Sequence, residues 1–331
     1  MAKAGMSRRS SARVARLLPP VIGGLALLVA LVGLIGTAIR DPRPHDIPVG
    51  LAGPAPAVQQ MSAAFASAAP GAFEFTSYAS EADARAAIDA RTVDGVLVLG
   101  TSPRLILAGA AGDAATGVIT AAFTNAFKAQ GVTLTVETVH PFAAGDAHGL
   151  ILFFVVVAII VSALVSQALV VATAGDAGFG ERLGVVAVFG ALAGVVGMGT
   201  AVWIAGFWTA VGLAALASAA VGAVVAGCAR LLGPPGIALA ALVVVLLDLV
   251  SSGGPVGSQL LPDFYRWLAP WMPAGQLYSS LRGALYFDGA GLQEPLLVLA
   301  GWLVGGLAMM WLGDFIHARK PSGTGVLAAA G

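Results

Sequence analysis

Residues 150–174 read LILFFVVVAIIVSALVSQALVVATA, a run without a charged residue, a proline or a glycine. A helix that crosses the hydrocarbon core of a bilayer needs about 20 mostly apolar residues, because the core is ~30 Å thick and each residue rises ~1.5 Å. Backbone groups in lipid have no water to bond, and this run shows no polar alternation. It therefore predicts a membrane-spanning helix.

Five further runs of this kind occur, at residues 19–39, 183–207, 210–232, 234–252 and 295–316. Hydrophobic residues make up 58% of the chain and charged residues 10%, whereas a soluble domain carries about 25% charged residues. The 17 basic and 17 acidic residues balance, which gives no sign of nucleic-acid binding. We therefore expect an α-helical integral membrane protein with six transmembrane helices, of which residues 150–316 hold five.

The first run, residues 19–39, follows a basic segment and is longer than the ~7–15 apolar residues of a cleavable signal. We expect an uncleaved signal anchor there, with a cleaved signal peptide as the alternative. Short loops rich in Lys and Arg stay in the cytoplasm. Nine of the 17 basic residues fall in the tails 1–18 and 317–331 and in short loops on the same side. This distribution predicts a plasma-membrane protein with both termini cytoplasmic and residues 40–149 outside.

Residues 40–149 contain ten of the 17 acidic residues, so this region is expected to be a soluble domain. Ser80-Glu-Ala-Asp83 resembles a capping box, and Gly131 is placed to close a helix. Strand patterns at 47–53, 73–78, 96–99, 105–108 and 132–139 alternate with helical patterns at 55–68, 80–91 and 113–130. The order βαβαββαβ predicts a small α/β extracytoplasmic domain between the first and second spans. It has no glycine-rich phosphate loop, so we expect it to hold a ligand, a partner or a second copy of itself.

Residues 255–294 are too polar and proline-rich to span a membrane, yet they are rich in aromatic residues. Aromatic side chains favour membrane interfaces. Pro262, Pro270 and Pro273 divide the segment, so we expect short helices that lie at the outer face or dip into it.

Candidate transport-path residues lie in and near this segment. Asp248 lies in a predicted span, where a carboxylate costs ~2.5–3.5 kcal/mol at the helix centre. Either it is a polar group on a substrate or proton path, or it is an interfacial carboxylate bonded to Ser251 or to a neighbouring helix. Plain interfacial anchoring is the alternative for the other candidates, which are the i,i+3 pair Asp263 and Arg266, and Tyr278 and Arg282 on one helical face.

The short cytoplasmic loop 175–182 is a candidate docking site for a partner ATPase, through Asp176, Glu181 and Arg182; an ordinary solvated loop is the alternative. Cys228 is the only cysteine, which excludes an intramolecular disulfide. No lysine stands in a Gly-Lys-Ser/Thr context, so ATP hydrolysis by a P-loop of its own is excluded. We expect no enzyme activity, no cofactor and no metal.

Three stretches are similar to the phage infection protein-like group of ABC-2-type transporter permeases. They are residues 78–88 (YASEADARAAI) with 93–98 (VDGVLV), the motif Leu261-Pro-Asp-Phe264 with Pro273, and residues 281–286 (LRGALY). The resemblance covers roughly residues 20–316. It implies one span, an outside α/β domain, five further spans, and re-entrant short helices before the last one. Where typical ATPase-coupled members have a longer cytoplasmic coupling segment, this chain has only Glu181-Arg-Leu-Gly184.

The leading hypothesis is a membrane permease subunit of an ABC-2-type exporter. It would move a hydrophobic or amphipathic substrate out of the cell, as a homodimer or heterodimer in the lipid bilayer, with a separate ATP-binding subunit. The rival is a non-transporting receptor or scaffold whose outside domain binds an envelope component or partner. A co-encoded ATPase chain separates the two.

Overall fold

The computed structural model describes residues 22, 25–26, 28–30, 32–205 and 210–319. The chain divides into two units, residues 1–42 and 43–331, and each is described by itself. The first unit contains the apolar helix Leu28–Ile39. The tail 1–18, several residues of the expected span 19–39, and residues 320–331 of the C-terminal tail lie outside the described residues. The first of the six expected spans therefore stays a prediction.

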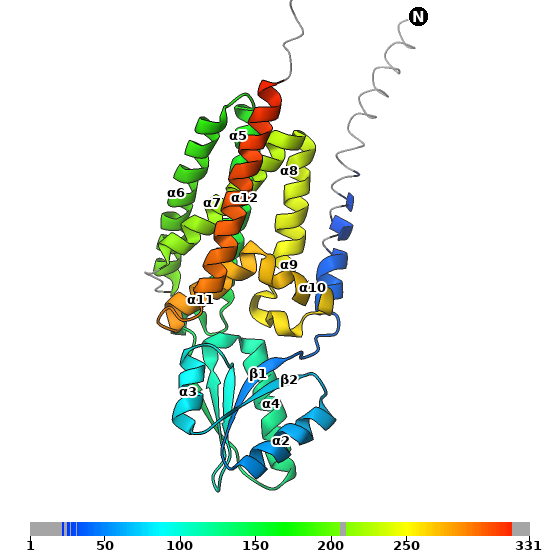
Figure 1. Ribbon diagram of the computed structural model, residues 1–331, viewed down its shortest axis with the longest axis vertical. Coiled ribbons are helices and arrows are strands. Elements are labelled where there is room, and N and C mark those ends of the chain that lie inside the picture. Colours follow the sequence, from blue (N-terminus) through cyan, green and yellow to red (C-terminus); the bar gives the residue numbers. More distant parts are fainter. Residues whose placement is uncertain (1–21, 23–24, 27, 31, 206–209, 320–331) are drawn as a thin grey trace, which may run out of the picture. The chain divides into compact units, whose positions relative to one another are not determined.

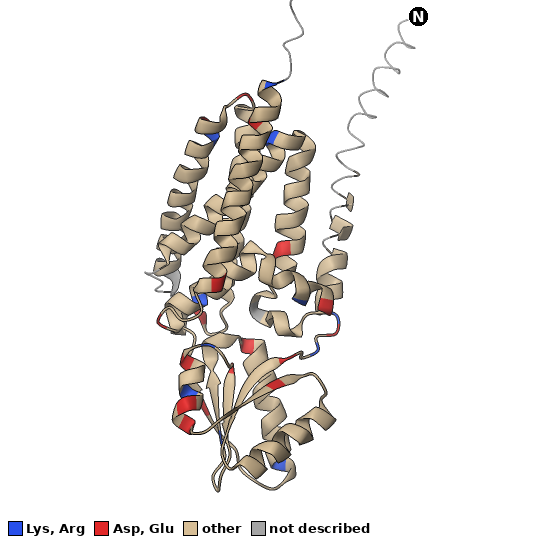
Figure 2. Ribbon diagram, viewed as in Figure 1, with Lys and Arg blue, Asp and Glu red and all other residues tan. Residues whose placement is uncertain are grey.

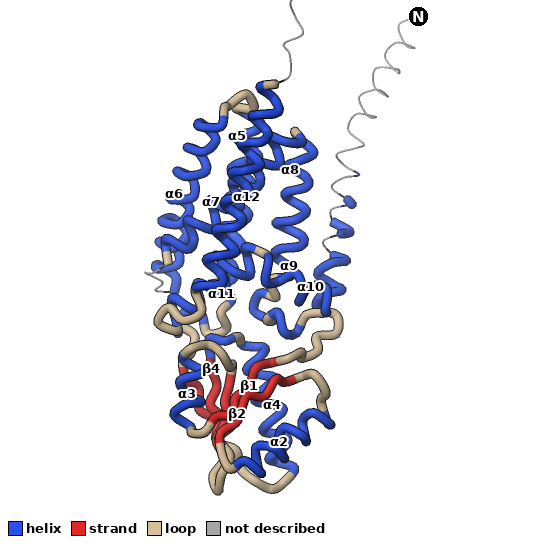
Figure 3. Tube along the Cα trace, viewed as in Figure 1, coloured by secondary structure: helices blue, strands red, loops and turns tan. Residues whose placement is uncertain are grey.

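The second unit begins with an α/β domain whose elements follow the predicted order βαβαββαβ (Figures 1 and 3). Its strands are β1 (Ile47–Ala52), β2 (Phe73–Tyr78), β3 (Gly95–Val98), β4 (Arg104–Ala108) and β5 (Thr135–Val139). Its helices are α2 (Ala55–Ala68), α3 (Glu81–Asp89) and α4 (Asp113–Ala129), with 3-10 turns η1 (Gly109–Ala111) and η2 (Ala144–Asp146).

The two helix-end signals expected from the sequence, at Ser80 and Gly131, are confirmed. Ser80 Oγ accepts a hydrogen bond from the Asp83 amide at 3.1 Å and so caps α3. Gly131 adopts φ +70° just after α4, and its amide bonds the Lys128 carbonyl at 3.0 Å. A side chain at this φ would be strained, which explains why glycine ends the helix.

The strands form one sheet in the order β2-β1-β3-β4-β5. Only the β3–β4 pair is antiparallel, because a short turn joins these two strands while helices cross over between the others. One face of the sheet packs on α2 and α4 through a buried cluster that includes Phe65 and Phe123. The other face packs on α3, around Ile88. The result is a three-layer domain with a core on each side of the sheet.

Among the described residues, five helices are long and apolar enough to cross a membrane. They are α5 (Leu150–Thr173), α6 (Phe179–Ala205), α7 (Val211–Leu232), the composite helix Pro234–Ser251, and α12 (Gln293–Ala318). Charged residues gather near the ends of these helices, and their middle parts are almost free of them (Figure 2). The expected spans 150–174, 183–207, 210–232, 234–252 and 295–316 thus correspond to observed helices, with ends shifted by a few residues.

The composite helix consists of α8 (Pro234–Ala241), the π-helical segment η3 (Leu242–Asp248) and α9 (Leu249–Ser251). Short helices follow it, as expected for residues 255–294: η4 (Gly254–Val256), η5 (Ser258–Leu260), α10 (Asp263–Leu268), η6 (Ala269–Trp271) and α11 (Pro273–Tyr286). We call residues 254–286 the outer segment, after the outer face at which the sequence predicts them to lie.

Helix α7 packs against α5, α6, α8 and α12. The sequence contains two GxxxG patterns, Gly190–Gly194 and Gly301–Gly305, a spacing that permits close helix packing but that also arises by chance in a chain with 44 glycines. A Cβ added at Gly194 on α6 would lie 2.6 Å from the Val211 carbonyl oxygen on α7. Gly301 and Gly305 on α12 have no atom within 4 Å of an added Cβ, so this pattern makes no close helix contact. The close contact on α12 is made by the next glycine, Gly306, which faces the α7 backbone.

Candidate functional site

The outer segment is built by its prolines. Pro262 precedes the first residue of α10, Pro270 lies in the first turn of η6, and Pro273 is the first residue of α11. Proline lacks an amide hydrogen and has a fixed φ, which suits the first turn of a helix but interrupts a continuing one. The three prolines thus turn a polar, aromatic stretch into short helices that differ in direction.

Asp248 fixes the start of α11. Its side chain is fully buried at the end of the π-helical segment, and Oδ1 accepts a hydrogen bond from the Ala274 amide at 2.8 Å. Oδ2 is buried without a hydrogen-bond partner. A carboxylate near the first amides of a helix satisfies a free donor and opposes the positive end of the helix dipole. The carboxylate of Asp248 is therefore bonded to a neighbouring helix, which is one of the two contacts expected for an interfacial carboxylate. The Ser251 hydroxyl donates to the backbone carbonyl of Asp248 and not to its carboxylate.

Tyr278 and Arg282 lie on one face of α11, as the spacing predicts, and both contact the α/β region. The Tyr278 hydroxyl donates to the Gly149 carbonyl at 3.2 Å, just before α5. The Arg282 guanidinium lies 4.8 Å from the centre of the Tyr278 ring and donates to the Ala111 carbonyl in η1. The second half of α11 is thus attached to the end of β4 and to the start of the first long helix.

Arg91, which sequence reasoning missed, connects the α/β domain to α11 from the other side of the contact. It follows α3 in the α/β domain, and its guanidinium donates to the Ser279 and Ala290 carbonyls at 3.1 and 3.2 Å and to Ser279 Oγ at 3.1 Å. It also lies 5.2 Å from the centre of the Phe287 ring. Arg91 thus extends from the α/β domain to α11, and Arg282 extends from α11 to the α/β domain.

Apolar contacts strengthen this attachment. Leu260 from η5 is buried in the sheet core that α2 and α4 cover. Phe287, directly after α11, is buried in the core on the α3 side. The outer segment therefore completes both cores of the α/β domain. We call the contacts of Arg91, Arg282, Leu260 and Phe287 the joint.

Asp94 lines the same cavity as the two arginines of the joint, and its charge acts on both. Burial raises the pKa of its carboxyl to about 6, although the charges of Arg282 and Arg91 act in the opposite direction. Burial and the nearby charge of Arg282 lower the pKa of Arg91 to about 10. Oδ2 of Asp94 is buried and has no hydrogen-bond partner. The carboxylate of Asp94 thus interacts with the charges of both arginines. Within the described part of the chain it forms no hydrogen bond or ion pair with either of them.

Asp263 and Arg266 form the expected i,i+3 pair at 3.3 Å. Arg266 also pairs with Asp46, just before β1, at 2.6 Å. This second pair ties α10 to the α/β domain, and it could not be seen from local spacing because the two residues are 220 positions apart.

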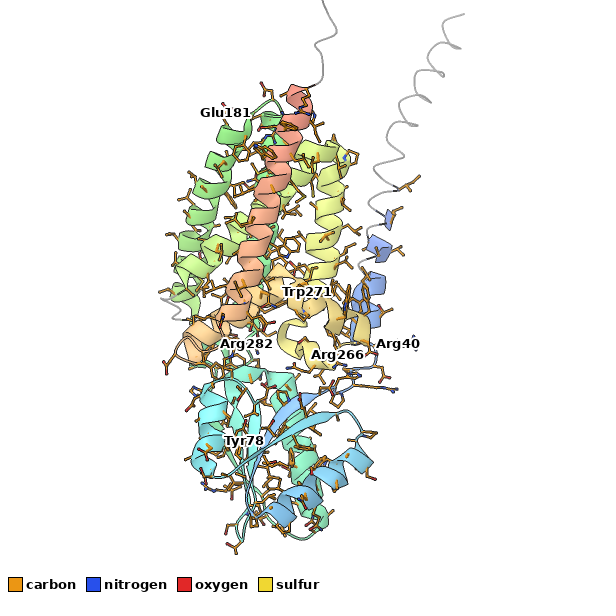
Figure 4. The ribbon with its side chains drawn as sticks, viewed as in Figure 1. Arg40, Tyr78, Glu181, Arg266, Trp271 and Arg282 are labelled. Atoms are coloured by element: carbon orange, nitrogen blue, oxygen red, sulfur yellow. The ribbon has the colours of Figure 1, made fainter. Side chains whose placement is uncertain are left out.

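A cavity of about 740 Å³ lies between the α/β domain and the outer segment. Its wall includes four of the five transport-path candidates: Asp263, Arg266, Tyr278 and Arg282. Asp248 does not line it but holds the start of α11. Arg266 and Arg282 both lie where the helices meet the α/β domain (Figure 4). The volume is in the range of ~300–1,000 Å³ typical of ligand pockets.

Asp146 is a second residue that sequence reasoning missed. Its carboxylate is buried and accepts the Ile151 and Leu152 amides, both at 2.8 Å, and so caps the start of α5. The signal was available as an acidic residue shortly before an apolar run.

The three docking candidates lie at the other end of the helices, where Figure 4 labels Glu181. Glu181 is exposed, and its side chain accepts the Gly178 amide at 2.9 Å. Asp176 is exposed. Arg182 is buried and donates to the Ala177 and Gly175 carbonyls at 2.8 and 2.7 Å. Arg182 thus holds the shape of the loop, while the two acidic residues remain accessible.

Comparison with known proteins finds no matching family model, no matching curated protein and no matching solved structure.

Proposed function

We propose that the chain is the membrane permease subunit of an ABC-2-type exporter, which moves a hydrophobic or amphipathic substrate out of the cell with a separately encoded ATPase. Residues 19–39 would be the first of six spans, both termini would be cytoplasmic, and the unit at work would be a dimer. The absence of a P-loop in the sequence makes the ATPase a separate chain.

The observation that carries the proposal is the double attachment of α11. At its start it is capped by Asp248 from an apolar helix, and along its second half it is fixed to the α/β domain through the joint. A shift of the composite helix Pro234–Ser251 would therefore move α11 and the wall of the cavity together. A simple membrane anchor has no need of such a connection, whereas a permease must open and close an exit.

The cavity is placed to receive a substrate at this exit. It lies at the end of the apolar helices, and its wall mixes aromatic, acidic and basic side chains. A substrate that leaves a path between the spans would pass residues 255–294 and meet this wall. Amphipathic molecules suit such a site, because they offer both an apolar and a polar part.

At the opposite end, Asp176 and Glu181 offer an accessible acidic surface on a loop whose shape Arg182 fixes. A preformed loop loses little conformational entropy when a partner binds. We therefore propose this loop as the ATPase contact.

The test is an affinity pull-down of the tagged protein from its native membrane in mild detergent, with mass spectrometry of what co-purifies. We expect a stoichiometric ATPase that contains a P-loop, and its loss from Asp176→Lys. The matched control is Glu74→Lys, which reverses an exposed acidic residue on β2 in the α/β domain and should retain the ATPase. Recovery of only the chain itself, or of envelope proteins bound through residues 40–149, would favour the receptor or scaffold reading.

A further inference from the structure

The cavity wall contains three arginines and four acidic residues, yet two of the arginines, Arg91 and Arg282, form no ion pair with any of these carboxylates within the described part of the chain. Arg91 and Arg282 donate to carbonyl and hydroxyl oxygens, and within the described part of the chain neither forms an ion pair. The charge of Asp94 acts on both. Half-buried guanidinium groups are stabilised by an anionic partner, since the surroundings screen their charges less than water does.

The same wall also offers a negative site. Asp94 is ionised above about pH 6, and its Oδ2 lacks a donor. A ligand with only a negative group would be repelled by this carboxylate, while a ligand with only a positive group would be repelled by the two arginines. A ligand that carries a negative group and a positive group close together can interact favourably with the arginines and with the carboxylate at the same time.

The other charged side of the cavity needs no ligand. Arg266 pairs there with Asp46 and with Asp263, so its charge is already compensated. Among the described residues, the charged side chains of the wall that form no ion pair are Arg91, Asp94, Arg282 and the exposed Glu294 at the start of α12.

The position of the cavity indicates where the ligand comes from. Trp267 lines it with 67% of its surface exposed, and the nearby Trp271 and Phe264 are 61% and 53% exposed. Exposed aromatic side chains at the end of apolar helices lie at the level of lipid headgroups. Glu294 and Pro295, at the start of α12, also line the cavity. The exposed Leu297 follows on the same helix, so the wall continues into a lipid-facing surface.

We infer that this cavity binds the headgroup of a membrane phospholipid that carries both a phosphate and a primary ammonium group. The phosphate lies against Arg91 and Arg282, and the ammonium group lies against Asp94. Arginine bonds phosphate oxygens with several donors at once, and a carboxylate accepts from the ammonium hydrogens. This inference needs no ATPase, and its failure would leave the exporter proposal untouched.

The test uses the full chain in nanodiscs of phosphatidylcholine, with the lipid retained after detergent extraction measured by native mass spectrometry. Equal additions of phosphatidylethanolamine, its N-methyl and N,N-dimethyl forms, and phosphatidylglycerol compete for retention. We expect the retained fraction to fall at each methylation, with about a tenfold preference for phosphatidylethanolamine over phosphatidylcholine, as one charge-assisted hydrogen bond provides. Equal retention of all four, or a preference for phosphatidylglycerol, would overturn the inference.

Two variants and one soluble probe complete the experiment. Asp94→Asn should reduce the preference by about tenfold, whereas Glu74→Gln, which changes an exposed acidic residue on β2 that does not line the cavity, should retain it. Loss of the preference in both variants would contradict the assignment to Asp94. Glycerophosphoethanolamine shares the headgroup but not the acyl chains, so we expect it to compete poorly at equal concentration. Binding as tight as that of the lipid would show that the source is a free solute and would refute the membrane origin.

Discussion

The hydrogen bond between Asp248 and the Ala274 amide predicts that Asp248→Ala will loosen the start of α11, while Asp248→Asn will not. In the alanine variant the amide of Ala274 loses its acceptor in a buried position. A buried donor without a partner costs about 1–3 kcal/mol. In the asparagine variant the side-chain carbonyl keeps the acceptor at the same place and removes a buried carboxylate.

Hydrogen exchange with mass spectrometry in nanodiscs measures this effect directly. Because each 1.36 kcal/mol is a factor of ten, the amides in the first turns of α11 should exchange about 5- to 150-fold faster in Asp248→Ala than in the wild type. The same amides in Asp248→Asn should stay within about fivefold of the wild type. Amides of α2, which packs on the sheet of the α/β domain, provide the internal control. The reasoning is refuted if both variants accelerate α11 equally, or if the alanine variant exchanges like the wild type.

Three further predictions follow from local geometry. Gly149 has φ +69°, and an added Cβ would lie 2.7 Å from a ring atom of Phe142 and 2.8 Å from the Tyr278 hydroxyl. Gly149→Ala should therefore lower the thermal unfolding temperature in detergent. The control Gly184→Ala, where an added Cβ inside α6 has no atom within 4 Å, should leave this temperature unchanged or raise it. Gly306→Leu should destabilise the α7–α12 contact and lower the yield of folded protein in size-exclusion chromatography, and Gly301→Leu, on the open side of the same helix, should not. Because the pKa of Asp94 is raised from 3.8 to about 6 in the folded protein, folding disfavours its ionised form. The contribution of Asp94 to the free energy of unfolding should therefore be largest below about pH 4 and fall by up to about 3 kcal/mol as the pH rises past 6. Unfolding followed by tryptophan fluorescence should show this fall in the wild type and not in Asp94→Asn.

Much of the fold could be predicted because its signals are local. The apolar run 150–174 is an observed helix almost to its ends, and Ser80 and Gly131 act at the helix ends where their chemistry placed them. The antiparallel β3–β4 pair follows from a short turn, but the sheet order β2-β1-β3-β4-β5 does not, because strand neighbours depend on packing between distant segments.

The site was predictable only in part, for the same physical reason. Tyr278 and Arg282 share a face because of helical spacing, and Asp263 reaches Arg266 across one turn. Arg91 contacts Ser279 across 188 positions, and no pattern within the sequence links the two. The glycines of α12 show the same limit. Gly301 and Gly305 match the GxxxG motif, but the close contact with α7 is made by Gly306. A motif gives the spacing of small residues but not the face that a partner helix will cover.

The most direct test of the exporter account is whether ATP moves the cavity wall. Cys228 is the only native cysteine, so Ser279→Cys in a Cys228→Ala background places one thiol in the cavity wall on α11. The complex obtained by pull-down is placed in nanodiscs, and the rate of labelling by a water-soluble maleimide is measured with and without Mg-ATP and vanadate. The account predicts a labelling rate that changes when nucleotide is trapped, in step with ATP hydrolysis by the partner chain. An unchanged rate in a complex that hydrolyses ATP would contradict the coupling of α11 to transport.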